Sequence, residues 1–277
     1  MTKIIINADD LGLNSIVNSE IERFIQDGLI TSSTMLANGE ALEDAIRIAK
    51  TYNDISFGVH LCLDEYNSLT KSEVLRKFGI IDDDNVFTRQ GVYKIKKTTK
   101  ELRGAIYDEL NAQIEVFVNA GIEISHIDGH HHCHTRNLWI LEILSDLAQK
   151  YNINIIRRPS SNRIILRNHE FAIQKLSNIK VENLRLKYKT FLWVTARVLF
   201  NSIWIRRVKK KFRTTDKFYS YYTFYHNISV LKPLIKNKTI ELMCHPGHPD
   251  YEIEANLIKE RVLDNFIRCK YVSYKLL

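Results

Sequence analysis

The residues best suited to chemistry lie in one short segment, His126-Ile-Asp128-Gly-His130-His131-His132-Cys133-His134, which holds five histidines within nine residues. Imidazole is the commonest protein ligand for first-row transition metals. A cluster this dense is costly to bury and unusual as surface decoration, so it indicates a functional site. Alternate members share a face only while the chain is extended, and Gly129 is expected to end that regularity. Not all five histidines can therefore be ligands, and Cys133 is expected to pack in the core.

A pair of carboxylates, Asp9 and Asp10, follows the apolar run 4–8. Neighbouring strand residues point to opposite faces, so both can serve one site only where the strand is ending, and Gly12 permits that break. Near a cation such a pair can divide its tasks, one carboxylate binding the metal and the other acting as a base. The alternative is that the pair caps a helix that begins near Asn14.

Two single histidines stand at further ends of apolar runs. His60 follows Gly58-Val59, and His245 lies between the run 239–244 and a Pro-Gly turn. His60 could be a metal ligand or a hydrogen-bonded core residue. His245 could be a general acid or a turn residue that bonds to the backbone. The residues alone leave both alternatives open.

Alternating strands and helices are expected to position these groups. The apolar patterns predict strands at 4–8, 31–37, 55–63, 122–128, 153–157, 239–244 and 270–274, and helices at 14–26, 40–51, 98–120, 137–151 and 254–267. Residues 64–97 are loop-rich. Repeated β-then-α units imply a parallel sheet, and catalytic groups collect at the carboxyl ends of its strands. All the candidate residues fall at such ends: Asp9-Asp10, His60, His126–His134, Arg157-Arg158 and His245. This agreement favours an α/β, (β/α) barrel-like domain over an open doubly wound sheet.

Length and composition fit one domain over residues 1–277, with 45% hydrophobic residues for its core. The start, Met1-Thr2-Lys3, leads directly into a strand without the pattern of a signal peptide. No apolar run approaches the roughly 20 residues that span a bilayer. The four cysteines show no CxxC spacing. We therefore expect a cytoplasmic protein with reduced thiols.

The net charge of +8 belongs to one segment. Residues 185–217 carry eleven Lys and Arg and one acid, which leaves −2 for the rest of the chain. Twelve aromatic residues between Tyr188 and Tyr225 are interleaved with this charge. We expect a basic aromatic helical insertion at about 160–225, with a helix near 190–205.

Three interpretations of this insertion remain open. It could be an outer helix or lid with solvated lysines. It could lie on an anionic membrane surface or bind a lipid-linked glycan, for which Trp193, Trp204 and the run 206–211 are suited. Nucleic-acid binding is disfavoured because no recognised motif accompanies the charge.

Five motifs, in order along the chain, resemble those of the YdjC-like carbohydrate deacetylases: 7–12 (NADDLG), 28–34 (GLITSST), 58–61 (GVHL), 126–134 (HIDGHHHCH) and 241–247 (ELMCHPG). The resemblance covers nearly the whole chain, including 215–218 (TDKF), and is specific for the family but not for a substrate. The chain departs from the commoner pattern at Leu11, where an aromatic residue is usual, and at His248. Neither departure touches a proposed ligand, but both could alter the pocket.

The resemblance implies a barrel-like fold and one divalent metal ion, zinc or magnesium, held by three ligands: Asp10, His60 and His130. It implies three catalytic residues: the base Asp9, the acid His245, and Arg157 holding the base. Three further members of the histidine segment are expected to bind the substrate: Asp128, His132 and His134. The family removes acetyl groups from N-acetylated sugars, so the expected partner is such a sugar or glycan.

The leading interpretation is therefore a metal-dependent hydrolase that deacetylates an N-acetylated sugar. A metal-dependent phosphoesterase would also suit the basic segment, but such sites usually recruit more bridging carboxylates for a second metal. A non-enzymatic, histidine-rich metal-binding protein leaves Asp9 and His245 without a role. A homo-oligomer is compatible with each interpretation, as is a cytoplasmic location peripheral to the membrane.

Overall fold

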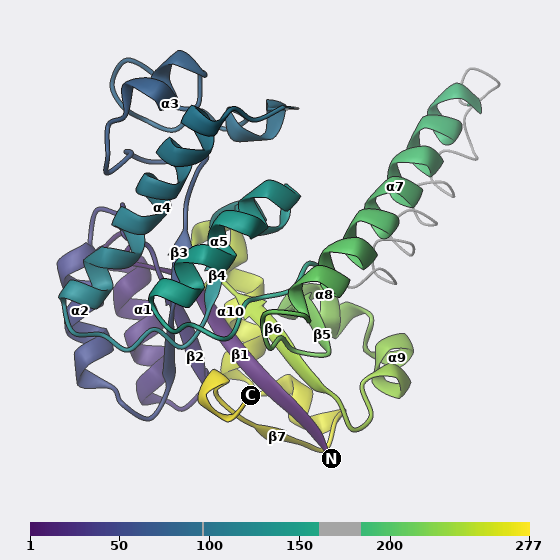
Figure 1. Cartoon of the computed structure of the whole chain (residues 1–277). Helices are drawn as coiled ribbons and strands as arrows, with labels where there is room; N and C mark the ends of the chain where they lie inside the picture. Colours follow the sequence, from purple (N-terminus) through teal and green to yellow (C-terminus); the bar gives the residue numbers. More distant parts are fainter. Residues whose placement is uncertain (96, 161–183) are drawn as a thin grey trace.

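The computed structural model describes residues 1–95, 97–160 and 184–277 (Figure 1). Its centre is a curled parallel sheet in the order β4-β3-β2-β1-β6-β5, with β7 paired to β1. The strands are β1 (Thr2–Leu11), β2 (Ser32–Met35), β3 (Ser56–Leu61), β4 (Ile127–Gly129), β5 (Lys217–Ser220), β6 (Thr239–Cys244) and β7 (Cys269–Tyr271). The predicted α/β class with a parallel sheet is confirmed.

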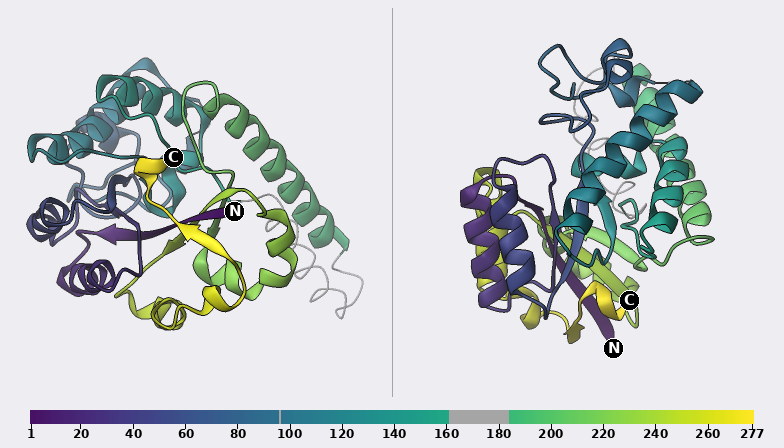
Figure 2. Two further views of the ribbon diagram at one scale, coloured as in Figure 1. Left: turned by 90° about the horizontal axis from the view of Figure 1, so that it is seen from below. Right: turned by 60° about the vertical axis from the view of Figure 1, so that its left-hand side comes forward.

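Helices stand around the outside of the strands (Figure 2). They are α1 (Ser15–Gln26), α2 (Leu42–Thr51), α3 (Glu73–Lys77), α4 (Lys100–Asn119), α5 (Leu138–Lys150), α7 (Leu184–Val208), α8 (Tyr221–His226), α9 (Ile228–Leu231) and α10 (Glu252–Lys259). Helix α1 buries Val17, Ile21 and Phe24 at the spacing of one helical face. Its N-cap is Asn14, whose side chain accepts a hydrogen bond from the Val17 amide. Asp9 and Asp10 therefore do not cap this helix, and that alternative is wrong.

Residues 153–157 lie between β4 and the residues that precede β5, and they pair with both. They form isolated parallel bridges, Ile156 with Ile127 and Ile155 with Arg213, rather than the strand that the sequence predicted. The Arg157 amide also donates to the carbonyl of Ile127 (2.9 Å). Because this segment bridges the two sides of the curled sheet, it carries the Arg157 side chain inside, where it is fully buried.

Several predicted boundaries differ from the structure. Of the predicted strand 122–128, only residues 127 and 128 belong to a strand, β4 (Ile127–Gly129). The predicted helix 254–267 ends at Lys259, because a 3₁₀ turn (Val262–Asn265) follows. Strand β5 was not predicted. It pairs with residues 240–243 of β6, so residues 217–220 belong to the sheet rather than to an insertion that continues to about 225.

The rest of the predicted insertion lies partly outside the described residues, since 161–183 are not described. Its described part is α7, which projects beyond the rest of the domain (Figure 1). The base of α7 packs on the domain through Trp204 and Val208, both fully buried. Trp204 is therefore not available for a membrane surface, and that part of the prediction is wrong. None of the described helices is both long and apolar enough to cross a membrane.

The loop after β3 is fastened to α4 by two buried polar side chains. Glu109 accepts hydrogen bonds from the amides of Leu69 and Thr70 and from the hydroxyl of Ser68 (3.1, 2.9 and 2.7 Å). Gln113 bonds to both the amide and the carbonyl of Cys62 (2.9 and 2.8 Å). Because both ends of residues 62–70 are fixed in this way, the segment between them forms a defined wall beside the carboxyl ends of the strands.

Candidate active site

A cavity of about 730 Å³ opens at the carboxyl ends of the strands. This volume lies within the range usual for small-molecule sites. Six of the predicted site residues line it: Asp9, Asp10, His60, His130, His132 and His245. Residues from β1, β3, the segment after β4 and the segment after β6 therefore meet in one place, as the strand-end argument predicted.

The backbone of β1 explains how Asp9 and Asp10 reach the same cavity. The strand continues to Leu11, but its register with β2 shifts between Ala8 and Leu11, and Asp10 has a left-handed φ of 68°. Left-handed backbone is rare outside glycine, although Asp tolerates it better than most residues. The left-handed backbone at Asp10 therefore allows both carboxylates to face the cavity. The strand ends at Leu11, directly before Gly12, which also has a positive φ (104°), so the strand ends where the sequence predicted that Gly12 permits it.

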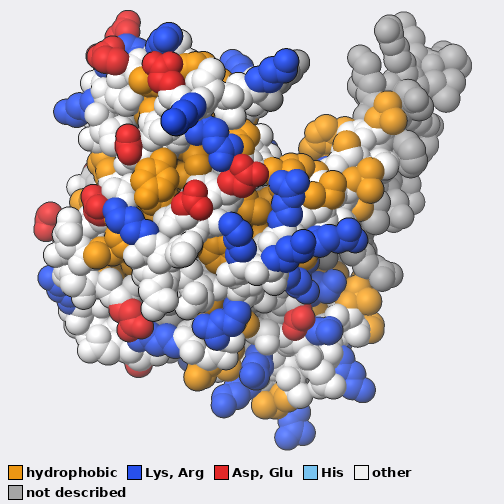
Figure 3. All heavy atoms as spheres, in the orientation of Figure 1, with side chains coloured by type: hydrophobic (Ala, Val, Ile, Leu, Met, Phe, Trp, Pro, Cys, Tyr) orange, Lys and Arg blue, Asp and Glu red, His pale blue; other side chains and the backbone are white. Residues whose placement is uncertain are grey.

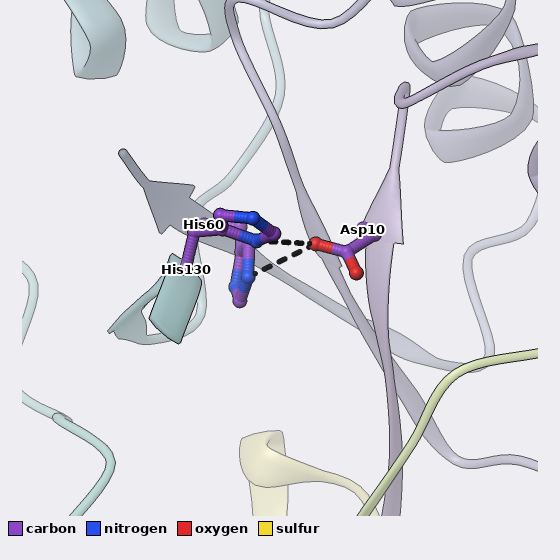
Figure 4. Close-up of side chains that lie close together, drawn as sticks. All are labelled: Asp10, His60 and His130. Atoms are coloured by element: carbon purple, nitrogen blue, oxygen red, sulfur yellow. Dashed lines mark hydrogen bonds and ion pairs between the residues drawn. The ribbon is translucent and has the colours of Figure 1, made fainter. Parts of the chain in front are cut away.

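Asp10, His60 and His130 converge on one point (Figure 4). Asp10 Oδ1 lies 3.2 Å from His60 Nε2 and 2.9 Å from His130 Nδ1. Burial opposes ionisation of Asp10, but hydrogen bonds to both histidines outweigh it and hold its pKa well below the usual range. Burial would lower the pKa of both imidazoles, but the surrounding carboxylates outweigh it and raise the pKa of each. The site therefore favours positive charge next to the Asp10 carboxylate.

Each of these histidines is oriented by a second carboxylate. Asp128 Oδ1 lies 2.7 Å from His60 Nδ1, and Glu65 Oε2 lies 3.1 Å from His130 Nε2. A carboxylate on one ring nitrogen fixes the tautomer and leaves the other nitrogen free as a donor of electrons to a metal. The arrangement presents His60 Nε2 and His130 Nδ1 toward Asp10.

Arg157 connects the carboxylates of three strands. Its guanidinium lies within 2.7 Å of both oxygens of Asp9, and within 2.6 Å of Asp128 and of Glu241. Burial raises the pKa of Asp9, but the charge and hydrogen bonds of Arg157 outweigh it, so the net shift is downward. Burial, with the charges of Asp128 and Asp9, raises the pKa of Glu241 to about 7 despite Arg157. Asp9 is thus held ionised and fixed in orientation.

The donor set fits a divalent cation. Four carboxyl groups are buried here, and Arg157 pairs with three of them, Asp9, Asp128 and Glu241, whereas Asp10 contacts His60 and His130 instead. The ligand atoms of Asp10, His60 and His130 lie within 4.8 Å of one another. One carboxylate with two imidazoles suits zinc and accommodates several other divalent ions.

Two other groups have similar spacing, Asp9 with His60 and Asp128, and Glu65 with His130 and His131. The first is less suitable because Arg157 holds both oxygens of Asp9 and one oxygen of Asp128, whose other oxygen contacts His60. The second is less suitable because Glu65 and His131 are partly exposed. The group built on Asp10 is therefore the best candidate for the metal.

His245 also lines the cavity, directly after the end of β6. Its amide donates to Glu254 Oε1 (3.0 Å), and its Nδ1 lies 3.6 Å from the same oxygen. Burial would lower the pKa of His245, but Glu254 and the Asp9 carboxylate outweigh it and raise the pKa. The ring also stacks on Tyr251, with centroids 4.2 Å apart. A protonated imidazole held in this way can donate a proton into the cavity.

The remaining histidines of the segment separate because His131 and His132 have left-handed backbone (φ 45° and 59°). His132 lines the cavity, and burial lowers its pKa to about 3. His131 also lines the cavity, with its Nδ1 3.1 Å from Asp64 Oδ2. The chain therefore turns at these two residues rather than at Gly129.

Asp128 and His134 are fully buried and do not line the cavity. Asp128 contacts His60 and Arg157, and His134 Nε2 lies 3.2 Å from the Arg157 carbonyl. His126 is also buried, stacked on Tyr274 with centroids 3.7 Å apart. These three buried side chains therefore pack behind the residues that line the cavity. The cavity lining gives no support to the prediction that Asp128 and His134 contact the substrate.

Several residues of the site escaped the sequence analysis: Asp64, Glu65, Tyr66, Glu241, Tyr251 and Glu254. Glu241 is a charged residue inside the apolar run 239–244, which is itself a signal of a buried ion pair. Asp64 and Glu65 come directly after the strand that carries His60, so the strand-end argument applied to them as well. Nothing in the sequence alone distinguishes Tyr66 from an ordinary loop residue.

Residues 3–271 match the profile of the YdjC-like protein family. The chain belongs to this family. A carbohydrate deacetylase of Vibrio parahaemolyticus serotype O3:K6 is 33% identical to this YdjC-like chain over 187 residues, which cover 63% of the chain and 68% of that protein. A carbohydrate deacetylase of Clostridium beijerinckii is 26% identical over 260 residues, covering 91% of the chain and 84% of that protein.

A third relative, a carbohydrate deacetylase of Vibrio cholerae serotype O1, is 33% identical, and the alignment covers 54% of this YdjC-like chain and 57% of that protein. Among solved structures, a protein of Enterococcus faecalis V583 described as a candidate cellobiose-phosphate cleavage protein superposes with a TM-score of 0.68 at 22% identity. The alignment covers 99% of this chain and 98% of that protein. This similarity supports the fold alone.

For the metal site, we predict that Asp10→Ala, His60→Ala and His130→Ala each lower the bound metal at least tenfold, whereas His131→Ala changes it less than twofold. Each of the first three removes a buried donor atom, while His131 contacts Asp64 outside that group. Metal analysis of dialysed variants after loading with zinc measures this. Unchanged metal content in the three ligand variants, or a large loss in His131→Ala, would contradict the assignment.

Proposed function

We propose that this protein is a metal-dependent hydrolase that removes an acetyl group from an N-acetylated sugar or oligosaccharide. The observation that carries the proposal is the meeting of three functional groups in one cavity: the Asp10–His60–His130 cluster, the Asp9–Arg157 pair and His245. Membership of the YdjC-like family and relatives named carbohydrate deacetylase support the same reaction. We assign the activity to a single domain that spans residues 1–277.

Asp10, His60 and His130 would hold the ion in this proposal. When bound, the ion would polarise the acetyl carbonyl and lower the pKa of a water molecule. Asp128 and Glu65 would keep the two imidazoles oriented through the ring nitrogens that do not face Asp10. These residues act before the reaction, by fixing where the acetyl group and the water can lie.

Asp9 would act as the general base. It is ionised, it lines the cavity, and Arg157 fixes both of its oxygens. The low pKa makes Asp9 a weak base in the resting site, but it also ensures that the carboxylate is available at neutral pH. Arg157 is in this view a positioning residue, which aligns Asp9 and shares its charge with Asp128 and Glu241.

His245 would act as the general acid. Amide hydrolysis requires protonation of the departing amine, and the raised pKa of His245 favours the protonated ring that can supply this proton. Glu254 stabilises that protonated form from the side of the ring that carries Nδ1. The proposed base and acid thus line the same cavity.

An acetate-release screen tests the reaction. We predict that the metal-loaded protein releases acetate from N-acetylglucosamine oligomers and no phosphate from generic phosphate esters. Release of phosphate with no acetate would favour the phosphoesterase alternative. Tight metal binding without either product would favour the non-enzymatic alternative. Removal of the metal with a chelator should abolish acetate release, and addition of the metal should restore it.

Two variants separate the roles of base and acid. We predict that Asp9→Asn and His245→Ala both retain metal and both slow acetate release, His245→Ala by roughly 10²- to 10⁴-fold. On an activated acetyl ester, whose leaving group needs little protonation, His245→Ala should recover and Asp9→Asn should remain slow. Equal impairment of both variants on the ester would contradict this division of roles.

We also propose that the protein acts in the cytoplasm at an anionic membrane surface, where lipid-linked glycans are accessible. Leu192, Leu199 and Ile203 are spaced about two and three turns apart on α7, and all are exposed. The buried Trp204 lies on a different side of the helix from this ridge, since consecutive helical residues are about 100° apart. Figure 3 shows hydrophobic side chains along α7 and Lys and Arg side chains near its base. An apolar ridge next to a basic cluster is the pattern of interfacial helices. A homo-oligomer is an alternative occupant of the same ridge.

Sedimentation with lipid vesicles tests this proposal. We predict that the protein binds phosphatidylglycerol vesicles more strongly than phosphatidylcholine vesicles, and that replacing Lys209, Lys210 and Lys211 by Gln removes at least most of the difference. The control replaces three exposed lysines at the opposite ends of the strands by Gln: Lys3, Lys236 and Lys270. Equal losses in both triple variants, or self-association of the protein without vesicle binding, would overturn the proposal.

A further inference from the structure

Tyr66 is an unusual residue in the wall of the cavity because its backbone is left-handed, with a φ of 64°. Bulky side chains rarely adopt this conformation, and the strain persists only where neighbouring structure enforces it. Such strain concentrates at functional sites, so an outlier that faces a candidate active site calls for a functional reason.

Hydrogen bonds on both sides of Tyr66 enforce the conformation. The Phe87 amide donates to the Tyr66 carbonyl (2.8 Å), and the Asn38 side chain donates to the carbonyl of Asn67 (3.1 Å). The Cys62 thiol donates to the carbonyl of Glu65 (3.1 Å). Together with the hydrogen bonds of Glu109 to residues 68–70, these contacts fix the backbone of the loop on both sides of Tyr66.

That path places the Tyr66 ring beside the candidate metal cluster. The ring is half-buried, and its centroid lies 5.8 Å from that of His130, with the planes tilted by 51°. Burial and the Asp10 carboxylate raise the pKa of the hydroxyl, so the side chain stays neutral. No described residue covers the ring fully, and its free part faces the cavity.

We infer that Tyr66 is a specificity-determining residue whose ring packs against the apolar C–H face of the sugar that carries the reacting acetamido group. The inference rests on the proposed deacetylase function. Aromatic rings bury much apolar area at little conformational cost, so a pyranose face is a suitable partner for this wall. The strained backbone is then the consequence of directing an aromatic ring to a point beside His130.

The test compares Tyr66→Gly with a matched variant, Lys71→Gly. Lys71 lies in the same loop and is also left-handed (φ 49°), but it is exposed and does not line the cavity. Glycine relieves backbone strain at both positions. We expect Tyr66→Gly to raise KM for an N-acetylglucosamine oligomer roughly tenfold, from the loss of one aromatic contact. Lys71→Gly should leave KM within twofold of wild type.

A small acetyl ester without a sugar ring provides the second readout. Tyr66→Gly should lose much less activity on this ester than on the oligomer, because the ester has no sugar ring to contact and the variant keeps every proposed ligand, the base and the acid. Tyr66→Phe should keep KM for the oligomer within threefold, since the ring is retained. If Tyr66→Gly does not fold, Tyr66→Asn replaces it, because Asn tolerates the left-handed backbone and lacks a ring.

The outcomes separate the inference from the function on which it rests. Acetate release by wild type with an unchanged KM in Tyr66→Gly overturns the inference and leaves the deacetylase function standing. Equal loss on the oligomer and on the small ester also overturns it, because the residue would then be structural. Absence of acetate release from every N-acetylated glycan by the wild-type protein overturns both.

Discussion

The ion pairs of Arg157 are the interaction on which the rest of the site depends. One fully buried guanidinium binds Asp9 of β1, Asp128 of β4 and Glu241 of β6. Removing one partner from a buried pair is strongly destabilising, roughly 3 to 5 kcal/mol, because a charge is left without compensation. Arg157 therefore couples the positions of the three strands. It also links the proposed base, Asp9, to Asp128, which orients His60.

This network also determines what the cavity can bind. Arg157 neutralises only part of the negative charge that the buried carboxyl groups bring to the strand ends. Asp10 lies outside its reach and instead contacts His60 and His130. Both oxygens of Asp9 bind the guanidinium of Arg157, whereas Asp10 does not contact Arg157 and can therefore bind a cation. The left-handed backbone at Asp10 separates these two roles in adjacent residues.

Much of this could be predicted from the sequence, because periodic apolar runs determine where strands and helices form and charged residues mark where the strands end. The meeting of Asp9, His60, His130 and His245 followed from that rule and is confirmed as geometry by the cavity lining. The partners of Arg157 could not be predicted from local pattern, since Asp9 and Arg157 are 148 residues apart. The left-handed backbone at Tyr66 was also hidden, because a hydrogen bond from the distant Phe87 amide holds it and its residue type does not favour it.

The most direct test of the account is anomalous X-ray diffraction from crystals of the protein soaked in zinc, measured at the zinc absorption edge. The account predicts one buried anomalous peak bounded by Asp10 Oδ1, His60 Nε2 and His130 Nδ1, with Asp9 still bound to Arg157. A peak beside Glu65 and His131, or one that draws Asp9 and Asp128 away from Arg157 as ligands, would contradict it.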